Sequence, residues 1–186
     1  LALYASKNGG RGQFRFYSAD LKDEAEERRI IEEDLRVALA EETLELHYQP
    51  IVRTDDNMVV VFEALMRWTH PERGYIGPNV FIPIAEESDL ILKLGEWALN
   101  KACMDALEWP ASVRVAVNVS AAQFTHSEFA DTVTQALEAS GLEPGRLELE
   151  LTESVFMGDS ETVEETFRTL KKLGIPADFY QKTDLH

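Results

Sequence analysis

Hydrophobic and polar positions divide the chain into stretches with different periodicities. Residues 20–42 are charged and strongly helix-forming, and their apolar residues recur near helical spacing. From Thr43 onward, β-rich stretches alternate with amphipathic stretches of helical period. The residues before the charged stretch are too few to fold alone. We therefore expect a short first segment, a linking helix, an α/β part and a tail, over residues 1–18, 19–42, 43–175 and 176–186.

The part after Thr43 predicts strands and helices in serial order. The expected strands are 44–52, 58–65, 112–120 and 147–151. A turn at residues 55–57 joins the first two strands into a hairpin, so the first strand runs antiparallel to the second. The later alternation favours a parallel sheet made by right-handed crossovers. Two architectures fit, an open doubly wound sheet or a β/α barrel, and in both the ligand binds at the carboxyl ends of the strands.

Turn and cap residues place the expected helices. A loop containing Pro71 and Pro78 precedes a helix that we expect to begin at a Ser88 cap. Two further helices are expected near residues 127–139 and 160–173, each ended by a glycine, Gly141 and Gly174.

Composition excludes several classes of protein. The chain has 18 Lys and Arg against 34 Asp and Glu, a net charge of −16, which repels a nucleic-acid duplex. Its single cysteine, Cys103, excludes an internal disulfide framework and is expected to be a buried apolar residue. No apolar run approaches the ~20 residues that cross a bilayer, and residues 1–17 show no signal-peptide pattern. We expect a globular, cytoplasmic chain with no membrane segment.

Polar residues gather where the predicted strands end. They are Gln49, Glu63, Asn118, Ser120, Glu150 and Glu153. Carboxylate and amide oxygens suit Mg²⁺ or Mn²⁺, whereas the ligand-like Cys or His spacing of a zinc site is absent. Carboxylates at strand ends also cap neighbouring helices or meet solvent. The residues alone therefore leave both a metal site and a structural role open.

Five strings in the α/β part carry a resemblance to a known family. They are YQPI (48–51), FEALMRW (62–68), FIPIAEES (81–88), VNVS (117–120) and ELTE (150–153). Their order and spacing resemble those of EAL domains, the cyclic di-GMP-specific phosphodiesterases of bacterial signalling, from about Leu35 to Gly174. Upstream, ALYASKNGGRGQFRFYS resembles the closing segment of a GGDEF (diguanylate cyclase) domain, so the first segment is expected to be a remnant of one.

The resemblance implies a fold, a reaction and a set of site residues. The fold would be a TIM-type (β/α) barrel, and the reaction the metal-dependent hydrolysis of cyclic di-GMP to linear pGpG. Glu63, the catalytic residue, would bind Mg²⁺ or Mn²⁺ together with Asn118 and Glu150. The dinucleotide would contact Gln49, Leu65 and Arg67, while Glu153 and, from a loop, Glu86 would support the site.

The last residues depart from the family pattern. After LKKLG (170–174) the family continues with a strand ending in two aspartates and a Phe-Gly-Thr-Gly loop, and later supplies a lysine, a glutamate and a glutamine to the site. The sequence instead reads IPADFYQKTDLH. A β/α barrel usually needs about 250 residues. We therefore expect an incomplete barrel of four to five strands, which covers its open surfaces as a homodimer or swapped oligomer.

Two classes of function compete for this chain. In the first, it belongs to a phosphodiesterase of cyclic di-GMP. In the second, it is a non-catalytic cyclic di-GMP-binding or protein-interaction module. Because the site residues of the second half of the barrel are not found, we expect this chain not to hydrolyse the dinucleotide by itself.

Overall fold

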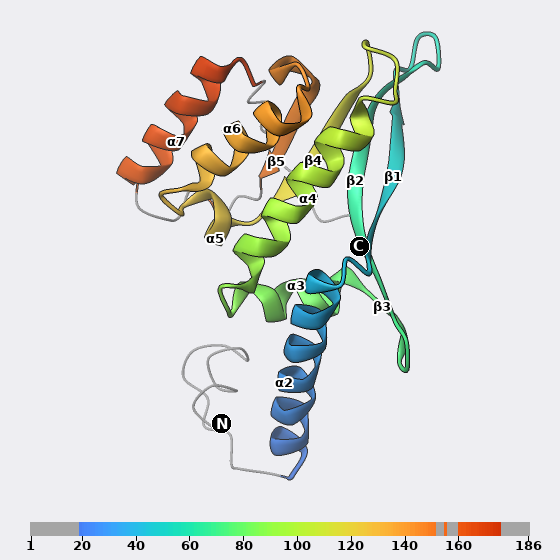
Figure 1. Ribbon diagram of the computed structural model, residues 1–186, viewed down its shortest axis with the longest axis vertical. Coiled ribbons are helices and arrows are strands. Elements are labelled where there is room, and N and C mark those ends of the chain that lie inside the picture. The colour runs from blue at the N-terminus through green and yellow to red at the C-terminus, as the bar shows by residue number, and fades with distance from the viewer. Residues whose placement is uncertain (1–18, 152–154, 156–159, 176–186) are drawn as a thin grey trace. The chain divides into compact units, whose positions relative to one another are not determined.

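The computed structural model describes residues 19–151, 155 and 160–175. The chain divides into two compact units, Leu1–Glu42 and Thr43–His186. Within the first unit the described element is helix α2, Ala19–Ala40 (Figure 1). The expected remnant of a cyclase domain and the expected tail lie outside the described residues. No helix among the described residues is long and apolar enough to span a membrane.

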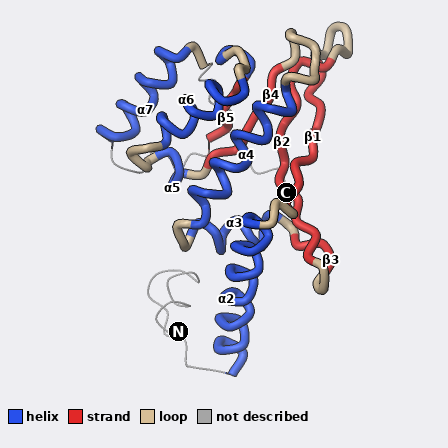
Figure 2. The backbone as a smooth tube through the Cα atoms, viewed as in Figure 1, coloured by secondary structure: helices blue, strands red, loops and turns tan. Residues whose placement is uncertain are grey.

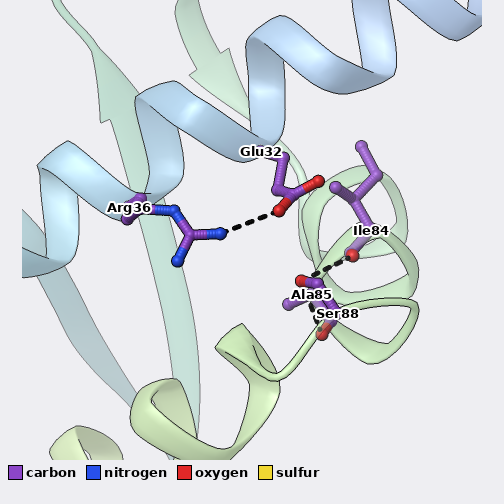
Figure 3. Close-up of polar contacts among 5 residues, drawn as sticks. All are labelled: Glu32, Arg36, Ile84, Ala85 and Ser88. Carbon is purple, nitrogen blue, oxygen red and sulfur yellow. Dashed lines mark hydrogen bonds and ion pairs between the residues drawn. The ribbon is translucent and has the colours of Figure 1, made fainter.

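Helix α2 has the charge pattern that its sequence predicts. Arg36 Nη2 lies 2.8 Å from Glu32 Oε1, one turn earlier (Figure 3), and Arg29 Nη2 lies 2.9 Å from Glu26 Oε1. Pairs of opposite charge at these spacings each contribute a few tenths of a kcal/mol to a helix. The charged residues of α2 therefore need no functional explanation, because their ion pairs stabilise the helix.

The second unit contains the sheet and the remaining helices, and it includes the predicted strands and helices in their predicted order together with β3, α3 and α5, which the sequence did not predict (Figure 1). Its strands are β1 (Leu44–Val52), β2 (Val59–His70), β3 (Gly74–Ile76), β4 (Arg114–Val119) and β5 (Leu147–Leu151). Its helices are α3 (Pro78–Glu86), α4 (Leu90–Ala106), α5 (Ala121–Phe124), α6 (Phe129–Ser140), the 3₁₀ turn η1 (Pro144–Arg146) and α7 (Ser160–Leu173).

The sheet is mixed, with strand order β1-β2-β4-β5 and β3 paired to β2 (Figure 2). Strands β1 and β2 form the predicted antiparallel hairpin, whose turn includes Asn57 at φ 57°. Strand β4 runs parallel to β2, and β5 runs parallel to β4. Among the described strands β1 and β5 end this order and do not pair with each other, so the sheet is not closed, as expected for an incomplete barrel.

The two faces of the sheet differ in chemistry because side chains alternate along each strand. One face presents Val115, Val117 and Val119 of β4 and the three leucines of β5, all of which are buried. Helices α4 and α6 pack on this face with buried residues that include Cys103 and Val133. The opposite face presents the alternate residues of the same strands, which are polar apart from Ala116, and it carries most of the candidate site.

The structure corrects the prediction for residues 71–88. The sequence predicts a loop here and a helix capped by Ser88, but the segment forms β3 and then helix α3. Ser88 lies after α3, and its hydroxyl donates to the carbonyls of Ile84 (3.4 Å) and Ala85 (3.3 Å) (Figure 3). Asp89 takes the N-cap position of α4 instead. Ser88 therefore satisfies the end of one helix rather than the beginning of the next.

The glycines expected to end the last two helices do so. Gly141 is the C-cap of α6 in the left-handed conformation, with φ 73°, and Gly174 follows α7 with φ 85°. This conformation is common where helices end, because glycine has no Cβ to oppose it.

Candidate functional site

Glu63 and Asn118 lie together on the polar face of the sheet. Glu63 stands in β2 opposite Ala116 of β4, and Asn118 lies two residues further along β4, on the same face. The side-chain Nδ2 of Asn118 donates a hydrogen bond to Glu63 Oε1 at 2.9 Å. Both side chains are half-buried. Two of the residues singled out from the sequence are therefore in direct contact.

Glu150 adds a third polar side chain to Glu63 and Asn118, so that the three form a row across β2, β4 and β5. In the parallel pairing of β4 and β5, Glu150 is the register partner of Asn118. Paired residues on neighbouring strands point to the same face. The polar face thus carries a carboxylate, an amide and a second carboxylate on three consecutive strands of the sheet.

The donor set suits a hard divalent cation. Oxygen ligands from carboxylates and amides are those that Mg²⁺ and Mn²⁺ prefer. The described residues contain no cluster of three or more His, Cys, Asp or Glu side chains arranged to hold a metal ion; the present row instead combines two carboxylates with an amide. Asn118 directs its Nδ2 at Glu63, and a half-turn of the amide would direct its Oδ1 there instead. The residues present therefore fit a cation at this position.

The predicted dinucleotide-contacting residues lie on the same pair of strands. Gln49 of β1 is exposed and is the register partner of Glu63. Leu65 and Arg67 follow Glu63 at intervals of two along β2, and both are half-buried. Arg67 Nη1 donates to the carbonyl of Met66 at 2.9 Å, which orients its guanidinium. The sheet therefore brings Gln49, Leu65 and Arg67 to the strand that carries Glu63.

A cavity of about 370 Å³ lies beside this row. Arg67, Asn118 and Glu86 line it, together with apolar residues of the sheet and of helices α3 and α4, including Met66, Ile82 and Val117. Such a volume is within the range of small-ligand pockets. The site thus combines polar groups with an apolar surface.

Glu86 lies at the end of a helix, which corrects the expectation that it acts from a loop. It is the last residue of α3. Partial burial raises the pKa of the Glu86 carboxyl, and the charge of neighbouring Glu87 raises it further. Glu86 lines the cavity, and its supporting role stays a prediction.

Ser120 has a structural role that the sequence analysis does not assign. It is the N-cap of α5: its hydroxyl accepts a hydrogen bond from Gln123 N at 3.3 Å, and its own N–H donates to Gln123 Oε1 at 3.0 Å. This reciprocal arrangement is a capping box. Both α5 and Gln123 were missed, although the Ser-x-x-Gln spacing after VNVS is the signal that finds them. Glu153 lies outside the described residues.

Comparison with known proteins identifies the family. The model of the EAL domain matches residues 32–177. The chain belongs to the EAL domain family. Among its relatives, a signalling protein of Caulobacter vibrioides is 45% identical over 175 residues, which are 94% of this chain and 22% of that protein. The bifunctional diguanylate cyclase/cyclic di-GMP phosphodiesterase MucR of Pseudomonas aeruginosa is 39% identical over 178 residues, 94% of this chain and 26% of MucR.

Solved structures confirm the EAL-type fold. The phosphodiesterase part of MucR in complex with cyclic di-GMP superposes with a TM-score of 0.74 and 41% identity, covering 78% of this chain and 60% of that one. The EAL enzyme Bd1971, bound to cAMP and cyclic di-GMP, gives a TM-score of 0.75 at 27% identity, covering 98% of this chain and 49% of that one. The EAL chain described here spans about a quarter of the length of the curated relatives it matches.

Proposed function

We propose that this EAL chain is the part of a cyclic di-GMP phosphodiesterase that binds the divalent cation and one phosphate of the dinucleotide. The observation that carries the proposal is the 2.9 Å hydrogen bond between Asn118 and Glu63, with Glu150 as the register partner of Asn118. Relatives named as cyclic di-GMP phosphodiesterases, MucR and NbdA, are 39% and 40% identical to this chain. The names of these relatives suggest the substrate class, and the row of Glu63, Asn118 and Glu150 suggests that a divalent cation takes part in the reaction.

Each residue of the site has a role in this proposal. Glu63, Asn118 and Glu150 hold Mg²⁺ or Mn²⁺, which supplies an activated water and neutralises charge on the phosphate. The reaction adds one water across one phosphodiester bond and opens the ring to linear pGpG. Arg67 presents a planar pair of N–H donors to a phosphate, which a lysine cannot do. Gln49 contributes an amide from the neighbouring strand, and Leu65 lies between the ligand-binding and cation-binding residues of β2.

The net charge of the protein favours a bound cation at the proposed site. With a net charge of −16, the chain as a whole repels a dinucleotide that carries two phosphates. Among the residues of the proposed site, Arg67 is the one positive side chain. A bound cation beside it therefore converts the site locally from repulsive to attractive for phosphate.

Cation binding by the 186-residue chain tests the proposal. Manganese binding is followed by electron paramagnetic resonance for the wild type, Glu63→Ala and Glu143→Ala. Glu143 is exposed and precedes the beginning of β5, so its replacement removes the same charge away from the proposed ligands. We expect Glu63→Ala to weaken binding at least tenfold and Glu143→Ala to leave it unchanged. Equal binding by all three proteins would overturn the proposed cation site.

A second experiment separates catalysis from binding alone. The chain is incubated with cyclic di-GMP and Mn²⁺, linear pGpG is followed by chromatography, and ligand binding is followed by calorimetry. We expect weak binding that Arg67→Ala abolishes, and no more pGpG than Glu63→Ala forms. Turnover above the Glu63→Ala control would assign hydrolysis to this chain by itself. Binding without turnover supports the non-catalytic alternative for this chain, with hydrolysis requiring the remainder of an EAL domain.

We also propose that the chain self-associates. Strand β5 pairs with β4 on one side, and no described strand pairs with its other side. Edge strands readily pair with another chain. Light scattering over a range of protein concentrations is expected to show dimers, and a monomer at all concentrations would reject this assembly.

A further inference from the structure

Gln123 is a buried polar residue beside the candidate site. Its exposed fraction is 5%, and it belongs with Glu148 and Thr166 to the few polar residues that are buried among those described. Through the capping box it binds the N–H of Ser120, which follows β4 directly and lies two residues after Asn118. Gln123 therefore holds the chain immediately beyond the strand that presents Asn118.

Helix α4 packs closely against the side-chain amide of Gln123. Gly95 lies in α4, and a Cβ built on it would fall 1.6 Å from Gln123 Nε2 and 2.7 Å from Gln123 Cδ. No side chain other than hydrogen fits at residue 95 while the glutamine keeps its place. The amide is thus fixed from two directions, by the N–H of Ser120 and by the backbone of α4.

Gln123 also lines two cavities of the fold. Gln123 lines the 370 Å³ cavity together with Arg67 and Asn118. It also lines a smaller cavity of about 110 Å³ together with His126 and Glu128. A shift of Gln123 would therefore change the wall of the cavity that Asn118 lines, and not only the cap of α5.

We propose that Gln123, held by Gly95, is a positioning residue for Asn118. The inference rests on the proposed cation site. The N–H of Ser120 is held by a side chain that packs against α4, so the end of β4 keeps its position and the side chain of Asn118 keeps its 2.9 Å hydrogen bond to Glu63 Oε1. Ligands need this support because a shift of about 1 Å is enough to impair a site.

The alternative is that the capping box stabilises α5 and nothing more. In that case loss of the Gln123 side chain loosens residues 121–124 but leaves Asn118 in place. The two roles differ in what happens to the Asn118 side-chain amide, which is observable without any ligand.

Two readouts on the 186-residue chain test the proposal. The first is hydrogen exchange of the Asn118 side-chain NH₂, measured by nuclear magnetic resonance in the absence of metal. The second is Mn²⁺ affinity, measured against the wild type. Gln123→Ala is expected to speed exchange at Asn118 and to weaken Mn²⁺ binding about tenfold, the lower end of the effect of outer-shell replacements at metal sites. Gln123→Glu is expected to stay near the wild type, since glutamate also forms a capping box with serine.

Gly95 provides an independent variant and a matched control. Gly95→Ala is expected to displace the Gln123 side chain and to have the same effects on Asn118 exchange and Mn²⁺ affinity as Gln123→Ala. In the double variant the alanine at residue 95 has no glutamine side chain to displace, so we expect no effect beyond that of Gln123→Ala. Gly145→Ala is the control, because a Cβ there meets nothing within 4 Å. If Gln123→Ala fails to fold, Asn118 exchange and Mn²⁺ affinity are compared between Gly95→Ala and Gly145→Ala, and that comparison tests the positioning role.

The outcomes separate this inference from the proposed function. Unchanged Asn118 exchange in Gln123→Ala, or in Gly95→Ala, would overturn the positioning role. Faster exchange with no Mn²⁺ binding by the wild type would support the positioning of Asn118 and reject the cation site. Faster Asn118 exchange together with weaker Mn²⁺ binding in the variants supports both the positioning role of Gln123 and the proposed cation site.

Discussion

Asn118 donates its side-chain amide to Glu63 although the two residues are 55 positions apart in the sequence. The contact crosses from β2 to β4 and depends on the register of two parallel strands. Because β4 lies between β2 and β5, the neutral amide of Asn118 stands between the strands that carry the carboxylates of Glu63 and Glu150. The neutral partner therefore limits the charge repulsion within the site.

Asn118→Asp tests this balance of charge. The substitution places a second carboxylate against Glu63, and two like charges in contact raise the pKa of one of them and destabilise the fold at neutral pH. We expect a lower melting temperature without metal and a larger rise on adding Mg²⁺ or Mn²⁺ than the wild type shows, because a ligand that binds the folded state stabilises it.

The control for this variant is Asn100→Asp, which makes the same change in charge on helix α4. Thermal unfolding with and without the cation measures both proteins. A metal-dependent rise no larger in Asn118→Asp than in Asn100→Asp would contradict a cation beside Glu63.

Four of the five described strands were predictable because their periodicity is strong, whereas the short β3 and the contact between Asn118 and Glu63 were not. The alternation in LELEL predicts β5 to the residue, but no local pattern says which residue of β4 faces Glu63. A slip of one residue would turn Asn118 to the other face. The predicted strand ends grouped Gln49, Glu63, Asn118 and Glu150, and the family resemblance added the role that each would have.

Helix α3 was missed because its prolines indicate a loop. Pro78 lies in the first turn, where a missing N–H is harmless, but Pro83 lies inside the helix, where proline is strongly disfavoured. The helix forms nevertheless, with Phe81, Ile84 and Ala85 buried. Tertiary burial thus outweighs local propensity, and a single sequence does not reveal that outcome.

Tyr48→Phe tests a hydrogen bond on the apolar face of the sheet. Tyr48 Oη donates to Asp105 Oδ2 at 2.7 Å, and Lys101 Nζ lies 2.6 Å from Asp105 Oδ1. Removing the hydroxyl leaves the half-buried carboxylate with one partner fewer, which is expected to lower the free energy of unfolding at pH 7 by about 1–2 kcal/mol. Urea denaturation measures the change.

The same variant has a predicted pH dependence. Burial, and then the hydrogen bond to Asp105, raise the pKa of Tyr48 above its ordinary value of 10.0. The folded state therefore retains a proton that the unfolded state loses above about pH 10, so wild-type stability falls as pH rises through this range. The fall is expected to be shallower in Tyr48→Phe. Tyr75→Phe, at an exposed tyrosine, is expected to match the wild type, and equal slopes in all three proteins would contradict the shift.

Cys103 is expected to be unreactive in the folded chain. It is fully buried against the sheet, and burial raises the pKa of its thiol to about 11, opposed by a hydrogen bond with Ser140. At pH 8 only about one thiol in a thousand is then ionised, and the thiolate is the reactive form. Reaction with a chromogenic disulfide is expected to await unfolding in urea; rapid labelling of the native chain would contradict the buried position.

Gly141→Ala tests the end of helix α6. Gly141 has φ 73° and donates its N–H to the Leu137 carbonyl at 2.8 Å. Alanine would keep this hydrogen bond only by adopting a left-handed conformation that costs about 1–2 kcal/mol for residues with a Cβ. A loss of that size in the free energy of unfolding is expected from urea denaturation, with an unchanged dependence on urea concentration. Gly145→Ala, three residues after the buried Leu142, is the comparison, because its conformation is not left-handed and its added Cβ meets nothing. If the two variants were destabilised equally, the cost would come from general loss of glycine and not from the left-handed cap.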